Sequence, residues 1–292
     1  MTWLSEYKRS LKMKEVEETI DLIVYRPLAF LLVKLIYNTR ITPDHLTFAA
    51  IIMGLIGAFF YAFGTQLTCN IGAFFYILFI ILDCSDGQLA RLKKSGTSLG
   101  RLLDGISDYI VVTAIYVGIA IGYSQKDGEP SSMLFLLILS GASIIIQEAL
   151  VDFYRTRFMD IVMMRKNTFE EGIKEYRKEY VRLKYLKGKW IERNIILIYL
   201  FYSKVQRNIT TKKKRVAFLD VSPGEFFKSN RVIIRFWVFM GPSAARTTLI
   251  LCSLFSRFDV YFWITIGAFN ILAALIWIIQ NQVDKSYLTH AK

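Results

Sequence analysis

The sequence is poor in the residues that disulfides and soft metal ions require. It has three cysteines and two histidines among 292 residues. Cys69, Cys84 and Cys252 are odd in number and lie in or beside apolar segments, so we interpret them as packing residues. His45 and His290 are too far apart for a histidine-based metal motif. The scarcity argues against a disulfide framework and against a metal site built on histidine or cysteine.

Acidic residues are also few compared with basic ones. The 24 Asp and Glu face 37 Lys and Arg, which gives a net charge of +13. Such an excess can indicate nucleic-acid binding, but we find no nucleic-acid motif. With 54% hydrophobic residues and a mean hydropathy of +0.37, the chain is more apolar than a soluble domain of this length. The composition therefore predicts a polytopic membrane protein with the lipid bilayer, and not nucleic acid, as its partner.

Long apolar runs predict an all-α integral membrane protein with six transmembrane helices. The predicted spans are about 41–64, 70–92, 99–123, 133–153, 232–255 and 260–283. Thr42 and Pro43 suit the cap and first turn of the first span. The fifth span contains Gly241 and Pro242, which predict a kink.

The remaining segments are polar or mixed. The stretch at 20–38 is apolar but interrupted by charges, which is typical of an amphipathic helix lying on the membrane. The first 18 residues are too charged for a cleaved signal peptide, so we expect them in the mature protein. A basic insert at 158–230 is expected to form helical hairpins on the membrane face and to attract anionic lipid. The predicted regions are 1–40 (juxtamembrane), 41–157 (spans one to four, with the site), 158–230 (insert) and 231–292 (last two spans and tail).

The distribution of Lys and Arg predicts the orientation. Six spans place both termini on one side, together with the link at 93–98 and the insert, and this side holds nearly all the basic residues. The opposite loops carry only Lys126 and Arg257. By the positive-inside rule the link and the insert face the cytoplasm, in the plasma membrane or an endomembrane.

Four carboxylates stand at the ends of two neighbouring apolar runs. Asp83 and Asp86 are spaced i and i+3, and Asp104 and Asp108 are spaced i and i+4, so each pair shares one helix face. A short link makes the two helices antiparallel neighbours, which brings all four acids to one end. The negative charges of such a cluster repel one another, and a hard divalent cation would relieve this repulsion. The alternative is a set of ordinary helix-end acids in water.

Residues around these acids indicate a bulky phosphorylated substrate. Gly87, Ala90 and Gly100 are small and leave room beside the carboxylates. Arg91, with Lys93 and Lys94 after it, suits phosphate. The sequence therefore predicts a metal site that handles a phosphorylated molecule.

The spacing Asp83-x2-Asp86-Gly87-x2-Ala90-Arg91-x8-Gly100-x3-Asp104-x3-Asp108 resembles, without departure, the signature of the class I CDP-alcohol phosphotransferases, also called CDP-alcohol phosphatidyltransferases. The signature covers under a tenth of the chain. The resemblance implies a membrane enzyme of phospholipid synthesis that displaces CMP from a CDP-alcohol with a hydroxyl acceptor. It also implies Mg²⁺ or Mn²⁺ as cofactor, a direct attack with no covalent enzyme intermediate, and a homodimer. No motif for a serine or cysteine nucleophile is present.

The resemblance also assigns roles to residues. It implies that Asp83, Asp86 and Asp104 hold metal, and that Asp108 both ligates metal and acts as the base. The positions that meet the nucleotide or leave room for it are Gly87, Ala90, Arg91, Thr97 and Gly100. Many members carry a Thr-Pro-Asn-x-x-Thr element before the first span. This chain has Asp44 where asparagine is usual, so Thr47 is the better candidate contact there and Asp44 the second.

The acceptor is open within this resemblance. Arg155, Arg157 and Arg246 lie outside the signature, and arginine binds phosphate well. They favour CDP-diacylglycerol as donor and a polar, phosphorylated alcohol as acceptor. The alternative is transfer of phosphocholine or phosphoethanolamine to diacylglycerol.

Two structural alternatives also stay open. Arg155 and Arg157 can be topology residues, and Arg246 can pair with Glu148 or another acid. An ion-coupled transporter that uses intramembrane acids is a more distant alternative, because we find no repeated halves.

Overall fold

The computed structural model describes residues 3–95, 98–125, 130–164, 168–186, 222–290 and, with short gaps, 189–204. All regular elements in these residues are helices. The chain forms two compact units. The first is Met1–Ile144 with Pro242–Ala268, and the second is Ile145–Gly241 with Phe269–Lys292.

The first unit contains the predicted site. Its elements are α1 (Trp3–Ser10), the π-helix η1 (Asp21–Tyr25), α2 (Arg26–Ile36), α3 (Pro43–Tyr61), α4 (Gln66–Lys93), α5 (Ser98–Ser124), the first part of α6 (Pro130–Val162), α11 (Pro242–Leu254), α12 (Phe258–Phe262) and the π-helix η3 (Trp263–Ala268). Thr42 caps α3 and Pro43 occupies its first turn, as the sequence predicted. Helix α4 ends at Lys93, and its C-cap Lys94, with a φ of 51°, turns the chain into the link to α5.

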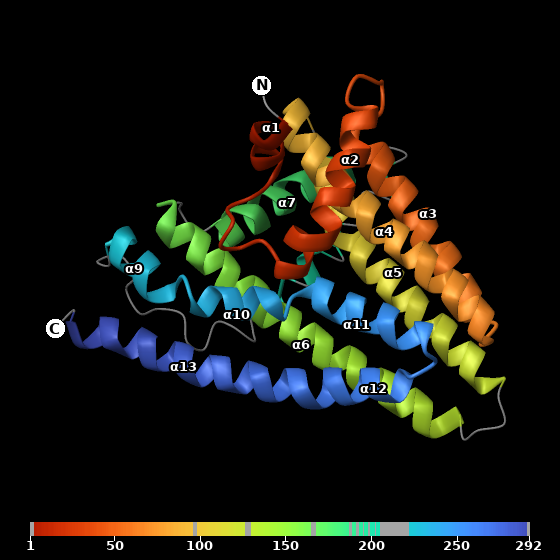
Figure 1. Ribbon diagram of the computed structural model, residues 1–292. Coiled ribbons are helices and arrows are strands. Elements are labelled where there is room, and N and C mark those ends of the chain that lie inside the picture. Colours follow the sequence, from red (N-terminus) through yellow and green to blue (C-terminus); the bar gives the residue numbers. More distant parts are fainter. Residues whose placement is uncertain are drawn as a thin grey trace. The chain divides into compact units, whose positions relative to one another are not determined.

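Helices α3, α4 and α5 run side by side (Figure 1) because small residues let their backbones approach. A Cβ added at Gly118 of α5 would lie 2.3 Å from the carbonyl oxygen of Ala58 on α3. Gly57 and Gly72 face each other between α3 and α4, where an added Cβ on either would lie 3.0 Å from the carbonyl oxygen of the other. This close packing fixes α4 against α3, and α3 against α5.

The second unit contains the rest of α6, with α7 (Thr168–Lys184), α9 (Pro223–Asn230), α10 (Ile233–Phe239) and α13 (Phe269–His290). The described part of the 158–230 insert is helical, and its basic run at 212–215 lies outside the described residues. Helix α6 extends to Val162, beyond the predicted end of the fourth span near 153, so Arg155 and Arg157 lie within the helix.

Five helical stretches are long and apolar enough to cross a membrane: Pro43–Tyr61, Gln66–Lys93, Leu103–Ser124, Ser132–Val162 and Phe258–Tyr287. The predicted fifth span, 232–255, is broken at Met240 and Gly241 into α10 and α11. With 7 and 13 residues, these helices are only about 10 and 20 Å long. Neither crosses a bilayer alone, so the structure supports an integral membrane protein but does not confirm a count of six.

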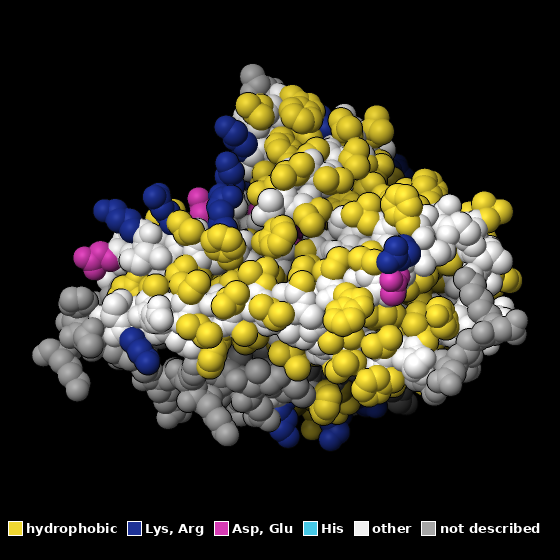
Figure 2. All heavy atoms as spheres, turned by 60° about the horizontal axis from the view of Figure 1, so that its bottom comes forward, with side chains coloured by type: hydrophobic (Ala, Val, Ile, Leu, Met, Phe, Trp, Pro, Cys, Tyr) yellow, Lys and Arg dark blue, Asp and Glu magenta, His cyan; other side chains and the backbone are white. Residues whose placement is uncertain are grey.

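The predicted amphipathic stretch at 20–38 is helical as η1 and α2. One face is buried, with Ala29, Phe30 and Val33 fully covered, while Leu31 and Leu35 are exposed. Exposed apolar side chains are widespread elsewhere too, and Figure 2 shows them over much of the face in view. Apolar side chains that face outward are what a lipid environment requires.

Candidate active site

Helices α4 and α5 bring three of the predicted carboxylates together. Asp83 and Asp86 lie one turn apart near the end of α4, and Asp104 lies near the start of α5. One oxygen from each of the three lies within 4.8 Å of the other two. Asp86 is buried, Asp83 is half-buried and Asp104 is exposed, so the cluster opens towards one side.

These residues fit a hard divalent cation. The set offers carboxylate oxygens, which Mg²⁺ and Mn²⁺ prefer. Oδ1 of Asp83 is buried and has no hydrogen-bond partner within the described part of the chain. A buried carboxylate oxygen without a partner is costly unless a proton or a cation satisfies it. The donor chemistry and this orphan oxygen together indicate a metal centre.

Asp108 lies one turn beyond Asp104 and has a cationic partner. Its Oδ2 is 2.7 Å from Nη2 of Arg246, which belongs to α11. Arg246 is only 7% exposed, and its guanidinium also lies 5.6 Å from the ring centre of Phe79. The arginine therefore pairs with an acid, as one alternative held, and the structure identifies that acid as Asp108. Oδ1 of Asp108 is buried without a hydrogen-bond partner among the described residues.

Thr47 contacts the carboxylate cluster directly. It is buried on α3, and its hydroxyl donates to Oδ2 of Asp86 and also contacts the carbonyl oxygen of Pro43 at 3.3 Å. This bond orients one of the three clustered carboxylates. Asp44, the second predicted contact, lies half-buried in the first turn of α3.

The remaining predicted nucleotide positions lie on the same two helices. A Cβ at Gly87 would come within 3.4 Å of both terminal nitrogens of Arg91, so the guanidinium lies over this glycine. Nε of Arg91 donates to the carbonyl oxygen of Ser10, while Nη2 is buried with no hydrogen-bond partner in the described chain. Ala90 is half-buried and Gly100 is buried. Thr97 lies outside the described residues.

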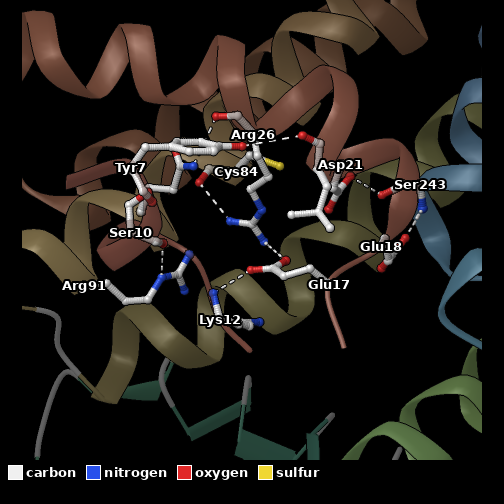
Figure 3. Close-up of polar contacts among 12 residues, drawn as sticks. Tyr7, Ser10, Lys12, Glu17, Glu18, Asp21, Arg26, Cys84, Arg91 and Ser243 are labelled. Carbon is white, nitrogen blue, oxygen red and sulfur yellow. Dashed lines mark hydrogen bonds and ion pairs between the residues drawn. The ribbon is translucent and has the colours of Figure 1, made fainter. Parts of the chain in front are cut away.

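Four charged residues of the N-terminal region are buried beside α4 and α11, and sequence reasoning missed them. Glu17, Glu18, Asp21 and Arg26 are between 2% and 7% exposed. Figure 3 shows Glu17 and Arg26 pointing at each other. Oε2 of Glu17 and Nη2 of Arg26 form an ion pair of 3.2 Å. Burial by itself opposes the charge on Arg26, but neighbouring negative groups, Glu17 among them, outweigh it and raise the pKa of this guanidinium. The sequence feature that could have indicated these buried residues is a group of charged residues directly before an apolar helix.

Arg155 and Arg157 belong to the second unit. Arg157 makes a bidentate ion pair with Asp284 of α13, with nitrogen–oxygen distances of 2.7 and 2.9 Å. Arg155 is half-buried on α6. Among the three predicted acceptor arginines, Arg246 is the one that the structure shows bonded to a carboxylate of the site.

Comparison with known protein families finds a match over part of the chain. Residues 40–170 match the family model of CDP-alcohol phosphatidyltransferase. The match contains α3, α4, α5 and α6, and with them all four aspartates. No curated protein matches the chain.

Proposed function

We propose that the chain transfers a phosphatidyl group from CDP-diacylglycerol to a polar, phosphorylated alcohol and releases CMP, because residues 40–170 match the CDP-alcohol phosphatidyltransferase family, a family of phosphotransferases. The observation that carries the choice of acceptor is the buried Arg246 bonded to Asp108. This ion pair supports the proposal because a guanidinium, which is well suited to phosphate, lies beside the proposed base.

We propose that Asp83, Asp86 and Asp104 hold Mg²⁺ or Mn²⁺ with help from Asp108. When bound, the cation would offset the charge of the pyrophosphate and of the departing CMP. Thr47 supports this arrangement because its hydroxyl fixes the orientation of Asp86.

The two carboxylate oxygens of Asp108 differ in their contacts. Oδ2 is held by Arg246, whereas Oδ1 has no hydrogen-bond partner in the described residues. In the proposed reaction this carboxylate takes the proton of the acceptor hydroxyl. The hydroxyl oxygen forms a bond to the phosphorus that carries diacylglycerol, and the bond from that phosphorus to the CMP oxygen breaks.

We propose that the nucleotide half of the donor lies along α4 and the start of α5. Gly87, Ala90 and Gly100 leave space there, and Arg91 has a buried Nη2 suited to a phosphate oxygen. Asp44, Thr47 and Thr97 complete the proposed contacts. Nε of Arg91 bonds Ser10, and this contact orients the guanidinium while Nη2 is kept for the phosphate in our proposal.

The acceptor proposal depends on the charge of Arg246. A phosphorylated alcohol offers an anion that arginine binds in a bidentate manner, whereas diacylglycerol has no phosphate. Arg157 bonds Asp284 through both terminal nitrogens, whereas Arg246 is paired through Nη2 with the proposed base itself, so we keep Arg155 and Arg157 as secondary candidates. Transfer of phosphocholine or phosphoethanolamine to diacylglycerol remains the runner-up.

For the membrane arrangement, we propose six spans, with α10 and α11 together forming the fifth. The carboxylate cluster then faces the cytoplasm, where soluble acceptors and CMP are found. We also propose a homodimer, as is common in this family.

Release of CMP by the purified protein tests the reaction. We expect CMP release from CDP-diacylglycerol with Mg²⁺ or Mn²⁺ and a phosphorylated alcohol, and no release with EDTA. A panel of acceptors, including glycerol phosphate, inositol phosphate and serine, identifies the alcohol. Efficient transfer from CDP-choline or CDP-ethanolamine to diacylglycerol would favour the runner-up.

Arg246→Ala tests the acceptor site. We expect the acceptor KM to rise strongly and the donor KM to change little, which is the pattern of lost acceptor binding. Arg155→Ala provides a comparison on another helix. Unchanged kinetics for both substrates in Arg246→Ala would contradict the assignment.

A further inference from the structure

Helix α11, which carries Arg246, starts after an interruption of the helical structure. The residues before it, Met240 and Gly241, separate it from α10, so a preceding helix does not determine where it begins. It also lies outside residues 40–170, the part that matches the family. Helix α11 packs against α4, and its end is bonded to Tyr61 and Gln66. The position of its first turns, which carry Arg246, depends also on contacts made at its start.

The N-terminal region supplies those contacts. Oε2 of Glu18 accepts a hydrogen bond of 2.8 Å from the backbone N–H of Ser243. Asp21 accepts a bond from the hydroxyl of the same serine, and the hydroxyls of Tyr25 and Thr247 lie 2.9 Å apart. Figure 3 shows Glu18 and Asp21 pointing towards Ser243.

These contacts meet one side of α11. Glu18 directly precedes the helical residues, Asp21 and Tyr25 are the first and last residues of the π-helix η1, and Ser243 and Thr247 are spaced i and i+4 on α11. Residues spaced i and i+4 share one face of an α-helix, so Ser243 and Thr247 present their hydroxyls on the same side.

The contacts also satisfy the start of α11. The first N–H groups of a helix have no partner within it, and Pro242 has no N–H at all, so Ser243 carries the first donor. A carboxylate there satisfies the donor and interacts favourably with the helix dipole. Glu18 and Asp21 are each 7% exposed. Because a buried carboxylate is costly unless it is hydrogen-bonded, these contacts define one geometry.

The same N-terminal segment is attached to α4 at its other end. The amide of Gln88 donates to the carbonyl oxygen of Arg26 at 3.1 Å, and the hydroxyl of Ser85 contacts the carbonyl oxygen of Ala29 at 3.3 Å. Gln88 and Ser85 flank Asp86 in sequence. Residues 18–29 therefore connect the helix of the metal-binding aspartates to the helix of Arg246.

We infer that Glu18 and Asp21 are positioning residues that hold Arg246 against Asp108 by anchoring the first turn of α11. Ser243 and Thr247, which make the contacts, lie on either side of Arg246 in the sequence. A tilt or slip of α11 would move the guanidinium away from Oδ2 of Asp108. The role in acceptor placement rests on the proposed function, whereas the structural coupling does not.

Chemical modification of Arg246 tests the coupling without catalysis. Phenylglyoxal modifies accessible arginines, and mass spectrometry of the Arg246 peptide gives the rate. We expect slow modification in the unaltered protein and a rate at least about fivefold higher in Glu18→Ala and Asp21→Ala, because loss of a helix cap frees the first turn. Glu18→Gln keeps an acceptor oxygen and should stay close to the unaltered rate. Glu6→Ala, which removes an exposed ion pair with Lys34 on the same region, is the matched control.

Kinetics test the consequence. Glu18→Ala and Asp21→Ala should lower kcat/KM for the acceptor by about tenfold or more, because small misplacement of a substrate-binding group is costly. In an Arg246→Ala background the same changes should have little further effect, since the residue that they position is gone. The affinity for Mn²⁺, measured by electron paramagnetic resonance, should stay unchanged in all of these variants. Tyr25→Phe removes one hydroxyl only and gives a milder variant if the alanine variants do not fold.

The outcomes are distinct. An unchanged Arg246 modification rate in Glu18→Ala and Asp21→Ala, or in Tyr25→Phe where those do not fold, would overturn the inference. The inference would also be overturned if Glu18→Ala or Asp21→Ala lowered kcat/KM for the acceptor by the same factor in the Arg246→Ala background as in the unaltered protein. Faster modification of Arg246 in a protein that releases no CMP with any donor would support the coupling and refute the proposed function.

Discussion

The four aspartates of the signature differ in what surrounds each carboxylate. Asp86 is buried and bonded by Thr47, Asp104 is exposed, and Asp108 is held by Arg246. Asp83 has a buried oxygen without a partner in the described chain. Chemically identical side chains therefore have different proposed tasks because their neighbours fix different numbers of their oxygens.

For Asp108, we predict that substitution by asparagine separates base chemistry from binding. Asp108→Asn preserves the shape and the contact with Arg246 but removes the basic carboxylate. Transfer should fall at least about a hundredfold, as expected for a lost general base. Binding of CDP-diacylglycerol and Mn²⁺ should largely survive when measured by equilibrium binding. Turnover close to normal would remove the assigned role.

For Thr47, we predict an effect on the metal. Thr47→Val keeps the size of the side chain but removes the hydroxyl that donates to Asp86. Partners that orient a ligand are typically worth 10- to 100-fold in metal affinity, so we expect the Kd for Mn²⁺ to rise by about tenfold or more. Thr47→Ser keeps the hydroxyl and should bind Mn²⁺ much as before. Equal Mn²⁺ affinity in both variants would leave Thr47 as a nucleotide contact only.

Among the elements, the close approach of α3 and α5 determines where Asp104 and Asp108 lie. Gly118 allows this approach because an added Cβ would lie 2.3 Å from the carbonyl oxygen of Ala58. We predict that Gly118→Ala lowers stability by about 1–3 kcal/mol, the usual cost of overpacking. Thermal unfolding in detergent should show a lower midpoint.

Gly105 is the matched control for this prediction. It lies on the same helix, and no heavy atom would come within 4 Å of an added Cβ there. Gly105→Ala should be neutral or stabilising, because alanine is favoured over glycine inside a helix by about 1 kcal/mol. A midpoint that falls equally in both variants would show that general helix effects, and not the contact with Ala58, dominate.

The break between α10 and α11 is the second feature at the scale of elements. A kink was expected from Gly241 and Pro242, and the structure shows two separate short helices. A helix that starts at this point exposes its own N-terminal N–H groups, which then require partners. The acids of the N-terminal region meet that requirement.

For the whole molecule, the prediction concerns orientation. Helix α5 connects Ser95, exposed after α4, with Gln125, exposed after α5. In a variant without Cys69, Cys84 and Cys252, a single cysteine at Gln125 should react with an impermeant thiol reagent in intact cells. A cysteine at Ser95 should react only after the membrane is permeabilised, because the positive-inside rule places this end in the cytoplasm. The reverse pattern would overturn the proposed orientation.

The sequence by itself indicated the helical class and the family resemblance. Apolar runs of spanning length and the eight fixed positions from Asp83 to Asp108 are local features, and a helix converts their spacing directly into shared faces. It also gave the start of α3, since Thr42 and Pro43 act within one turn. The family match over residues 40–170 confirms the resemblance that these positions indicated.

Only the tertiary structure decided which distant residues meet the signature helices. The partner of Asp108 lies on α11, and the supports of α11 lie near the N-terminus, more than 200 residues away in sequence. No spacing rule connects such residues, because their contact depends on how separate helices pack. Glu18 and Asp21 look like ordinary interfacial charges in the sequence, and Arg246 stands out there without an identified partner. Packing buries the three residues and makes them parts of one arrangement.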